Sequence, residues 1–165
     1  MAFIGRRSWF ENKKKDTDVK LPTLKQVTDY TNNLYKEKEY VKFIIHYLLI
    51  NYGTRNKDVD VFVTDDIKKI KEPINYIVVG KNYATWYVND YKTLKSHGTK
   101  KFIIKAKKFM DAIRQIPNDT WLLQTNGEHI ADTGLATTIK RMLYNNLTEG
   151  TYFKIIMKHI NSQPN

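Results

Sequence analysis

The segment that follows Glu39 carries the hydrophobic pattern around which the chain is organised. Its apolar side chains recur at helical spacing, which predicts a helix with one face buried in the core. The positions that define this face are Tyr40, Phe43, Ile44, Tyr47 and Leu48. Gly53 interrupts the pattern, at a place where glycine adopts a left-handed turn at little cost. We expect a core helix that ends in a glycine turn, with Arg55 held rigidly after it.

Helical spacing recurs in four other segments. Thr23 and Gln26 form a capping-box pattern, which is typical of a helix start. Pro117 stops a helix expected over 105–116, and another ends near Gly150. The apolar positions that predict these four helices are Leu24, Val27, Thr31 and Leu34; Phe109, Ala112, Ile113 and Ile116; Leu135, Ile139, Met142 and Leu143; and Phe153, Ile156 and Ile160.

Between the helices the pattern changes to that of β-strands. Residues 74–79 and 83–88 are rich in β-branched and aromatic side chains and are separated by Gly-Lys-Asn, which predicts a hairpin. A third strand is expected at 101–104. The alternation of valines within 56–63 fits either a strand or a short helix, and Asn126-Gly127 is a strong turn signal. The expected fold class is α+β, mostly α: a helical domain with a small three-stranded antiparallel sheet.

Length and charge add the domain organisation and a class of partner. A chain of 165 residues suits one domain, so we expect a basic aromatic arm at 1–20 and a single domain at 21–165. Lys and Arg number 28 against 17 Asp and Glu, which gives a formal net charge of +11. This excess favours an anionic partner, most often nucleic acid, although acidic proteins and membrane surfaces also attract basic proteins.

Several classes of site are excluded by residue types. The chain has no cysteine, which excludes disulfides, thiolate catalysis and cysteine zinc sites. Its four histidines lack metal-ligand spacing, so we expect no metal and no cofactor. No apolar run has the roughly 18 residues that a membrane helix needs, and no signal peptide is evident. The expected location is therefore intracellular, in the cytoplasm or nucleus of a host cell, with no membrane partner.

Three segments together resemble a known family. YLLINYGTRNKDVDVFVTDDI contains Arg55, WYVNDYKTLKSHGTKKFIIKAKKFMDAI contains Lys92, and TTIKRMLYNNL contains Arg141. In this order they resemble the catalytic domain of tyrosine recombinases, the phage integrase family. The resemblance implies a recombinase-like domain over 21–165, with Arg55 and Arg141 as the two catalytic arginines and Lys92 as the catalytic lysine. Lys95 and Lys100 are alternative positions for the lysine.

The resemblance also implies a chemistry. Strand exchange in that family passes through a pentacovalent phosphate whose extra negative charge two arginines neutralise. The lysine protonates the leaving 5′ oxygen, and a tyrosine forms a covalent phosphotyrosine. The expected partner is double-stranded DNA.

The chain departs from the family pattern at two positions. Thr138 stands where the family has a histidine, and no tyrosine follows Tyr152, although the family's nucleophile lies well beyond the second arginine. His159 is a weak match to the late histidine, and Tyr144 lies too early for a nucleophile. The resemblance therefore implies a DNA-binding protein that is catalytically inactive, or one whose nucleophile comes from another chain.

Other residues have both a structural and a functional interpretation. Arg55 fits a phosphate contact, or an ion pair with Asp58 or Asp60 that holds the turn. The densest basic run fits a solvated helix face, or a phosphate-binding surface completed by Lys92, Lys95 and His97. Its members are Lys100, Lys101, Lys105, Lys107 and Lys108.

Aromatic residues also leave alternatives open. Trp86, Tyr83 and Tyr87 fit base stacking, or core packing on one face and hairpin packing on the other. Trp121 is expected in the core, and His129 at the surface.

A second function from a different class is also open. The arm at 1–20 combines three consecutive lysines with Trp9 and Phe10, and the chain is rich in the residues that AT-rich genomes encode. These features favour a structural protein of a virus or phage particle, such as a minor capsid or connector component. Its partners would be other protein chains of a larger assembly. An active recombinase or nuclease is a third alternative.

Overall fold

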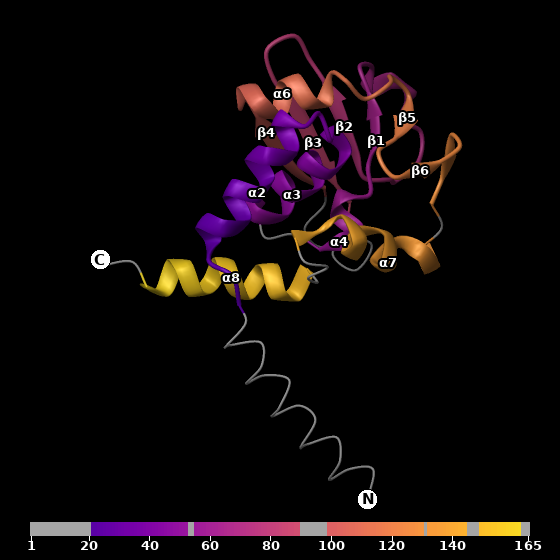
Figure 1. The fold of residues 1–165 in the computed structure, drawn as a ribbon. Coiled ribbons are helices and arrows are strands. Elements are labelled where there is room, and N and C mark those ends of the chain that lie inside the picture. The colour runs from indigo at the N-terminus through magenta and orange to yellow at the C-terminus, as the bar shows by residue number, and fades with distance from the viewer. Residues whose placement is uncertain (1–20, 53–54, 90–98, 131, 145–148, 163–165) are drawn as a thin grey trace, which may run out of the picture.

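The computed structural model contains one mixed β-sheet with helices packed on one of its faces (Figure 1). It describes residues 21–52, 55–89, 99–130, 132–144 and 149–162. The helices are α2 (Leu24–Lys36), α3 (Tyr40–Tyr52), α4 (Asn56–Val59), the 3-10 helix η1 (Ile67–Lys69), α6 (Lys107–Ile113), α7 (Asp132–Met142) and α8 (Glu149–Ser162). The strands are β1 (Phe62–Thr64), β2 (Tyr76–Val79), β3 (Ala84–Val88), β4 (Lys100–Ile104), β5 (Thr120–Trp121), β6 (Gln124–Thr125) and β7 (Glu128–His129).

Five strands form the main sheet, in the order β4-β3-β2-β1-β5. The neighbours β4, β3 and β2 pair antiparallel, β1 pairs parallel with β2, and β5 pairs antiparallel with β1. The expected sheet of three antiparallel strands is therefore wrong, because those strands form only part of a larger mixed sheet. Strand β5 has two residues, which is too short for a recognisable alternation of apolar and polar positions. The segment 56–63, which fitted a strand or a short helix, contains the short helix α4 and the start of β1.

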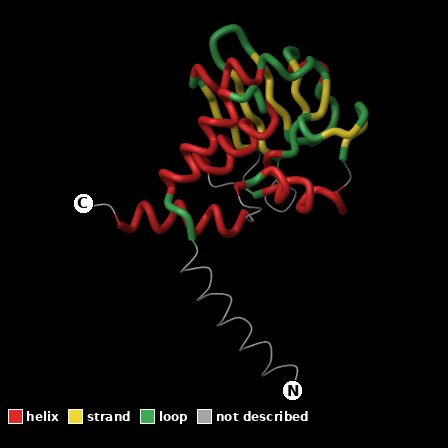
Figure 2. Tube along the Cα trace, viewed as in Figure 1, coloured by secondary structure: helices red, strands yellow, loops and turns green. Residues whose placement is uncertain are grey.

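The helices expected from the hydrophobic pattern are present. The Thr23 hydroxyl accepts the backbone N–H of Gln26, and the Gln26 side chain accepts that of Thr23, so the predicted capping box starts α2. The core helix α3 is buried along most of its length, with Phe43, Ile44 and Leu48 almost inaccessible to water. It packs against α2, α6 and α8. Figure 2 shows α2, α3 and α6 in front of the sheet, whereas α8 lies below it.

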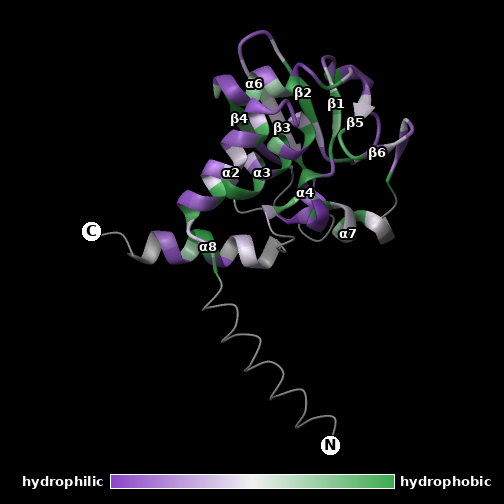
Figure 3. Cartoon of the chain, viewed as in Figure 1, coloured by the Kyte–Doolittle hydropathy of each residue, from purple (hydrophilic) through white to green (hydrophobic). Residues whose placement is uncertain are grey.

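The two faces of the sheet differ in burial. On the inner face, Ile77 and Trp86 are buried, and the Tyr52 ring from α3 packs edge-on against Trp86 with a centroid distance of 5.5 Å. On the outer face, Tyr76 and Tyr87 are half-buried and lie outside the main core. In Figure 3, strands β1 and β2 are largely hydrophobic. Hydrophobic residues thus occupy both faces, although the helices cover the inner one.

A second, two-stranded sheet follows β5. Asn126 and Gly127 have φ values of 52° and 85° and connect β6 to β7. Both values lie in the left-handed region that a tight hairpin turn with Asn-Gly requires. The predicted turn is confirmed, and it turns the chain back so that His129 lies opposite Gln124.

Candidate nucleic-acid interface

Arg55 lies immediately before the short helix α4. Its backbone N–H donates to the Asp58 carboxylate at 3.0 Å, and its guanidinium lies 3.4 Å from the other carboxylate oxygen. The indole N–H of Trp86 donates to the backbone oxygen of Asp58 at 3.1 Å, which ties the turn to the sheet. The expected ion pair with Asp58 is therefore present. Any phosphate at Arg55 would share the guanidinium with this carboxylate, although 52% of the arginine side chain is exposed.

Arg141 lies in the last turn of α7 and is exposed. Helix α7 packs against α4, so the elements that carry Arg55 and Arg141 are neighbours in space (Figure 1). Within the part of the chain that the structure describes, no carboxylate pairs with Arg141. Thr138, which stands in place of the family's histidine, is half-buried one helical turn earlier.

The longest basic surface segment runs from β4 into α6. The five lysines within 100–108 are all exposed, and Asp111 is the only acidic residue between 100 and 114. The Asp111 carboxylate accepts the Tyr35 hydroxyl at 2.9 Å. None of the five lysines forms an ion pair with a carboxylate of the described residues. This segment therefore presents positive charge that no described carboxylate neutralises.

Two members of that segment have polar or aromatic neighbours. The Lys108 amine lies 3.3 Å from the Asn32 side-chain oxygen and 5.7 Å from the centre of the Tyr35 ring. The Lys101 amine lies 5.8 Å from the centre of the Tyr87 ring, which places Lys101 on the outer face of the sheet. Both contacts leave the amines available to an anion, because aromatic rings and amides carry no net charge.

Of the remaining predicted site residues, some lie in segments that the structure does not describe. Lys92 and Lys95, the family-matched lysine and its alternative, lie outside the described residues, as does His97. His159 is exposed in the last turn of α8, a helix that packs against α3 and α2. The arm at 1–20 also lies outside the described residues.

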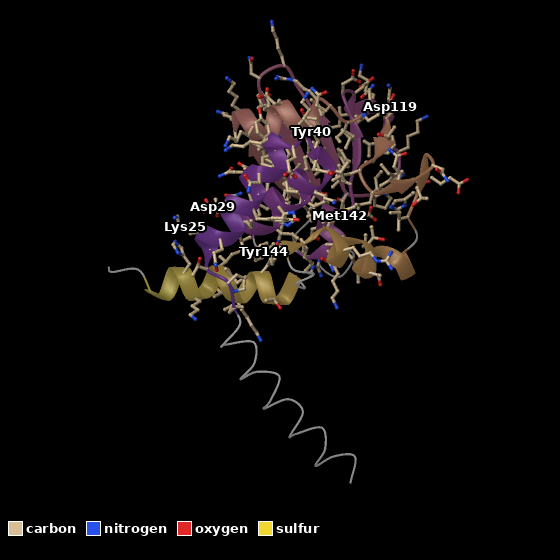
Figure 4. All side chains as sticks on the ribbon, viewed as in Figure 1. Lys25, Asp29, Tyr40, Asp119, Met142 and Tyr144 are labelled. Atoms are coloured by element: carbon tan, nitrogen blue, oxygen red, sulfur yellow. The ribbon has the colours of Figure 1, made fainter. Side chains whose placement is uncertain are left out.

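Tyr152 is the last tyrosine of the sequence, and its setting is unsuited to nucleophilic attack. The side chain is 2% exposed, and its hydroxyl accepts the backbone N–H of Tyr144 at 2.9 Å. Burial raises the pKa of Tyr152 well above the usual value for tyrosine. Tyr144 lies between α2 and α8 (Figure 4), where its ring packs against Tyr30 at a centroid distance of 5.1 Å.

One polar arrangement was missed by the sequence analysis. Nε2 of His129 lies 2.8 and 2.9 Å from the two carboxylate oxygens of Asp60, and the His129 ring stacks on Trp121 at a centroid distance of 3.7 Å. Trp121 was expected in the core, but it is half-buried on the outer face of the sheet. The Asn126-Gly127 turn was the available signal, because it brings His129 back towards β5.

Comparisons of the chain with protein-family models, with curated proteins and with solved structures find no match. The resemblance to tyrosine recombinases therefore stays a hypothesis that rests on the three segments alone. Among the described residues, none of the helices is long and apolar enough to cross a bilayer.

Proposed function

We propose that this protein binds double-stranded DNA through the phosphate backbone and does not cleave it. The observation that carries the proposal is the run of lysines at Lys100, Lys101, Lys105, Lys107 and Lys108, which are exposed and without a described carboxylate partner. Cations of this kind neutralise phosphates and release the counterions condensed on DNA. The net charge of +11 supports the same partner, because it attracts a polyanion from a distance.

Arg55 and Arg141 are a second candidate phosphate contact. They lie on neighbouring elements, and arginine binds phosphate through two parallel N–H groups. The ion pair between Arg55 and Asp58 makes this contact weaker than the lysine segment, because a phosphate competes with the carboxylate for the guanidinium. We therefore assign most of the binding free energy to the lysines.

The absence of cleavage is supported by the candidate nucleophiles and by the replaced histidine. The Tyr152 hydroxyl is buried and accepts the backbone N–H of Tyr144, so it is not available to attack a phosphate. Thr138 lacks the imidazole that would donate a proton to a phosphate oxygen. A covalent protein–DNA product on nicked duplex would contradict this part of the proposal.

The test is duplex-DNA binding by fluorescence anisotropy across a salt series. The variant replaces Lys105, Lys107 and Lys108 by alanine, and the control replaces Lys25, Lys68 and Lys71, which are also exposed. We expect weaker binding by the first variant only. We also expect the slope of log K against log salt to become shallower by about 0.9 for each lysine that contacts a phosphate.

Two results would overturn the proposal. Equal losses in both triple variants would mean that only net charge matters and that no surface is preferred. Undetectable binding of duplex by the native chain at low salt would exclude the function altogether. Circular dichroism of each variant checks that the fold is retained.

A further inference from the structure

The outer face of the sheet carries a row of aromatic residues on four neighbouring strands, and a lysine continues the row on the fifth. In the strand register, Trp121 of β5 lies opposite Phe62 of β1, Phe62 opposite Tyr76 of β2, and Tyr76 opposite Tyr87 of β3. Lys101 of β4 lies opposite Tyr87 and ends the row. We call these four aromatic residues with Lys101 the aromatic row. At a strand spacing of about 4.8 Å, the aromatic row extends over roughly 19 Å.

The rings of the row are arranged in two groups, one stacked and one edge-on. Tyr76 and Tyr87 are nearly parallel, with a centroid distance of 4.6 Å and an interplanar angle of 16°, and the Lys101 amine lies over Tyr87. Trp121 packs edge-on against Phe62 at 5.6 Å. The His129 ring, held by Asp60, stacks on Trp121 and extends the row at this end.

The aromatic row is not part of the hydrophobic core. All four aromatic side chains are half-buried, whereas Trp86, which points to the other face from the same strand as Tyr87, is 0% exposed. The neighbouring outward positions are Thr64, Val78, Thr85 and Ile103. Thr64 and Thr85 are buried, whereas Ile103, at the β4 edge, is 54% exposed. Helices α2, α3 and α6 lie on the opposite face (Figure 1). A partly exposed apolar surface of this kind is typical of a binding site.

The charge of this face indicates the kind of ligand. Within the described strands of the main sheet, no outward position is acidic, and Lys101 places a cation at one end of the aromatic row. Bases offer flat π faces that stack on aromatic rings, and the phosphates between them are attracted to lysine. Bases are available for stacking on a sheet face only when they are unpaired.

We propose that the aromatic row binds the unpaired bases of single-stranded nucleic acid, with Lys101 contacting the phosphate backbone. Tyr76 is the central contact, because one face of its ring stacks on Tyr87 and no described ring covers the other, whereas the Tyr87 ring lies between Tyr76 and the Lys101 amine. Lys101 is shared with the lysine run of the proposed duplex contact, but the four rings are not, and Lys105, Lys107 and Lys108 lie outside the aromatic row. This site neither requires duplex binding nor follows from it.

The test is the binding of end-labelled oligothymidylate and oligouridylate by anisotropy at moderate salt. Tyr76→Leu keeps an apolar side chain but removes the ring, and we expect it to weaken binding roughly 5- to 150-fold, the range for loss of one base–aromatic stack. Tyr76→Phe keeps the ring and should bind nearly as the native chain does. Tyr83→Leu is the matched control, because Tyr83 is a 47% exposed tyrosine next to β3 but outside the aromatic row.

A second measurement locates the bases. Stacking on Trp121 quenches its fluorescence, so oligothymidylate should quench the native protein more than Trp121→Phe, in which the indole is replaced by another ring. Binding of one oligonucleotide chemistry in preference to the other would assign the site to DNA or to RNA.

The two proposals fail in distinguishable ways. If Tyr76→Leu and Tyr83→Leu bind oligonucleotides equally well, the aromatic row is not the site, and the duplex proposal is unaffected. If Tyr76→Leu loses single strands while the lysine triple variant keeps duplex binding unchanged, the aromatic row stands and the duplex proposal fails. Absence of any single-strand binding by the native chain also overturns the inference.

Discussion

His46 is the only histidine of the chain that the structure places in the core, among the three whose positions it describes. Its ring is 0% exposed and packs against Tyr30 and Tyr152 at centroid distances of 5.3 and 5.7 Å. Nδ1 lies 2.7 Å from the backbone oxygen of Lys42, and Nε2 has no hydrogen-bond partner among the described residues. Burial is the main cause that lowers the pKa of His46 from 6.5 to about 4.

This pKa shift predicts a loss of stability in mild acid. Because the folded pKa lies below the unfolded one, the unfolded chain binds the proton more readily, and stability falls as the pH is lowered from about 6.5 to 4. The full effect is on the order of 3 kcal/mol. Urea unfolding at a series of pH values should show this loss in the native chain and a smaller one in His46→Phe, which keeps a buried ring. His159→Gln, at an exposed position, should behave like the native chain.

At the scale of elements, two glycines differ in whether their surroundings leave room for a side chain. Gly80, in the turn between β2 and β3, donates its N–H to the Tyr83 carbonyl, and a Cβ added there would lie 2.8 Å from that oxygen. Gly134 lies within α7, where an added Cβ would meet only the Ile130 side chain, at 3.6 Å. The first glycine is required by a close backbone approach, whereas the second only weakens a helix.

Alanine substitution at these glycines should change stability in opposite directions. Gly80→Ala forces the hairpin turn apart and should lower the unfolding free energy by about 1–3 kcal/mol. Gly134→Ala should raise it by up to about 1 kcal/mol, since alanine is the better helix former. Denaturant unfolding of both variants measures the difference. Equal effects of the two changes would mean that the turn relaxes without loss.

The sequence was informative where an element is long and its pattern is local. Helices α2 and α3 and the strands β2, β3 and β4 were expected because their apolar positions repeat over at least one full element. Strand β5 was not, since two residues hold no period. For 56–63 a strand and a short helix were both open, and the pairing of β1 with β2 of the hairpin and with β5 far beyond it is fixed only by the tertiary fold.

The candidate site shows the same limit. The lysine segment and the ion pair of Arg55 with Asp58 involve residues close in sequence, so composition and spacing pointed to them. The aromatic row joins residues from 62 to 121, and its membership depends on strand register, which a single residue shift would reverse. Trp121 was assigned to the core for this reason, because an isolated tryptophan gives no information about the face of the sheet that it occupies.

At the scale of the molecule, the excess positive charge destabilises the folded state, although it also attracts anionic partners. A net charge of +11 on 165 residues creates repulsion that is stronger in the compact chain than in the unfolded one. The positive charge is densest in the segment 100–114, which has six basic residues and one acidic residue. Bound polyanion would relieve this repulsion.

Salt should therefore stabilise the free protein. Raising sodium chloride from low to physiological ionic strength shortens the screening length to about 8 Å, so the urea midpoint should rise. The variant with alanine at Lys105, Lys107 and Lys108 should start from a higher midpoint at low salt and gain less from added salt. A midpoint that falls with salt in the native chain would show that attractive ion pairs, such as Lys69 with Asp119, outweigh the repulsion.

The order of strands in the sheet has a consequence for the newly made chain. On one side, β1 pairs with β2, the next strand along the chain. On the other side it pairs with β5, which begins only at Thr120. During synthesis, β1 and β2 leave the ribosome while the second edge of β1 still has exposed N–H and C=O groups. An open edge of this kind pairs readily with other chains. Once β5 has been made, its two residues pair with this edge of β1 and cover the exposed N–H and C=O groups.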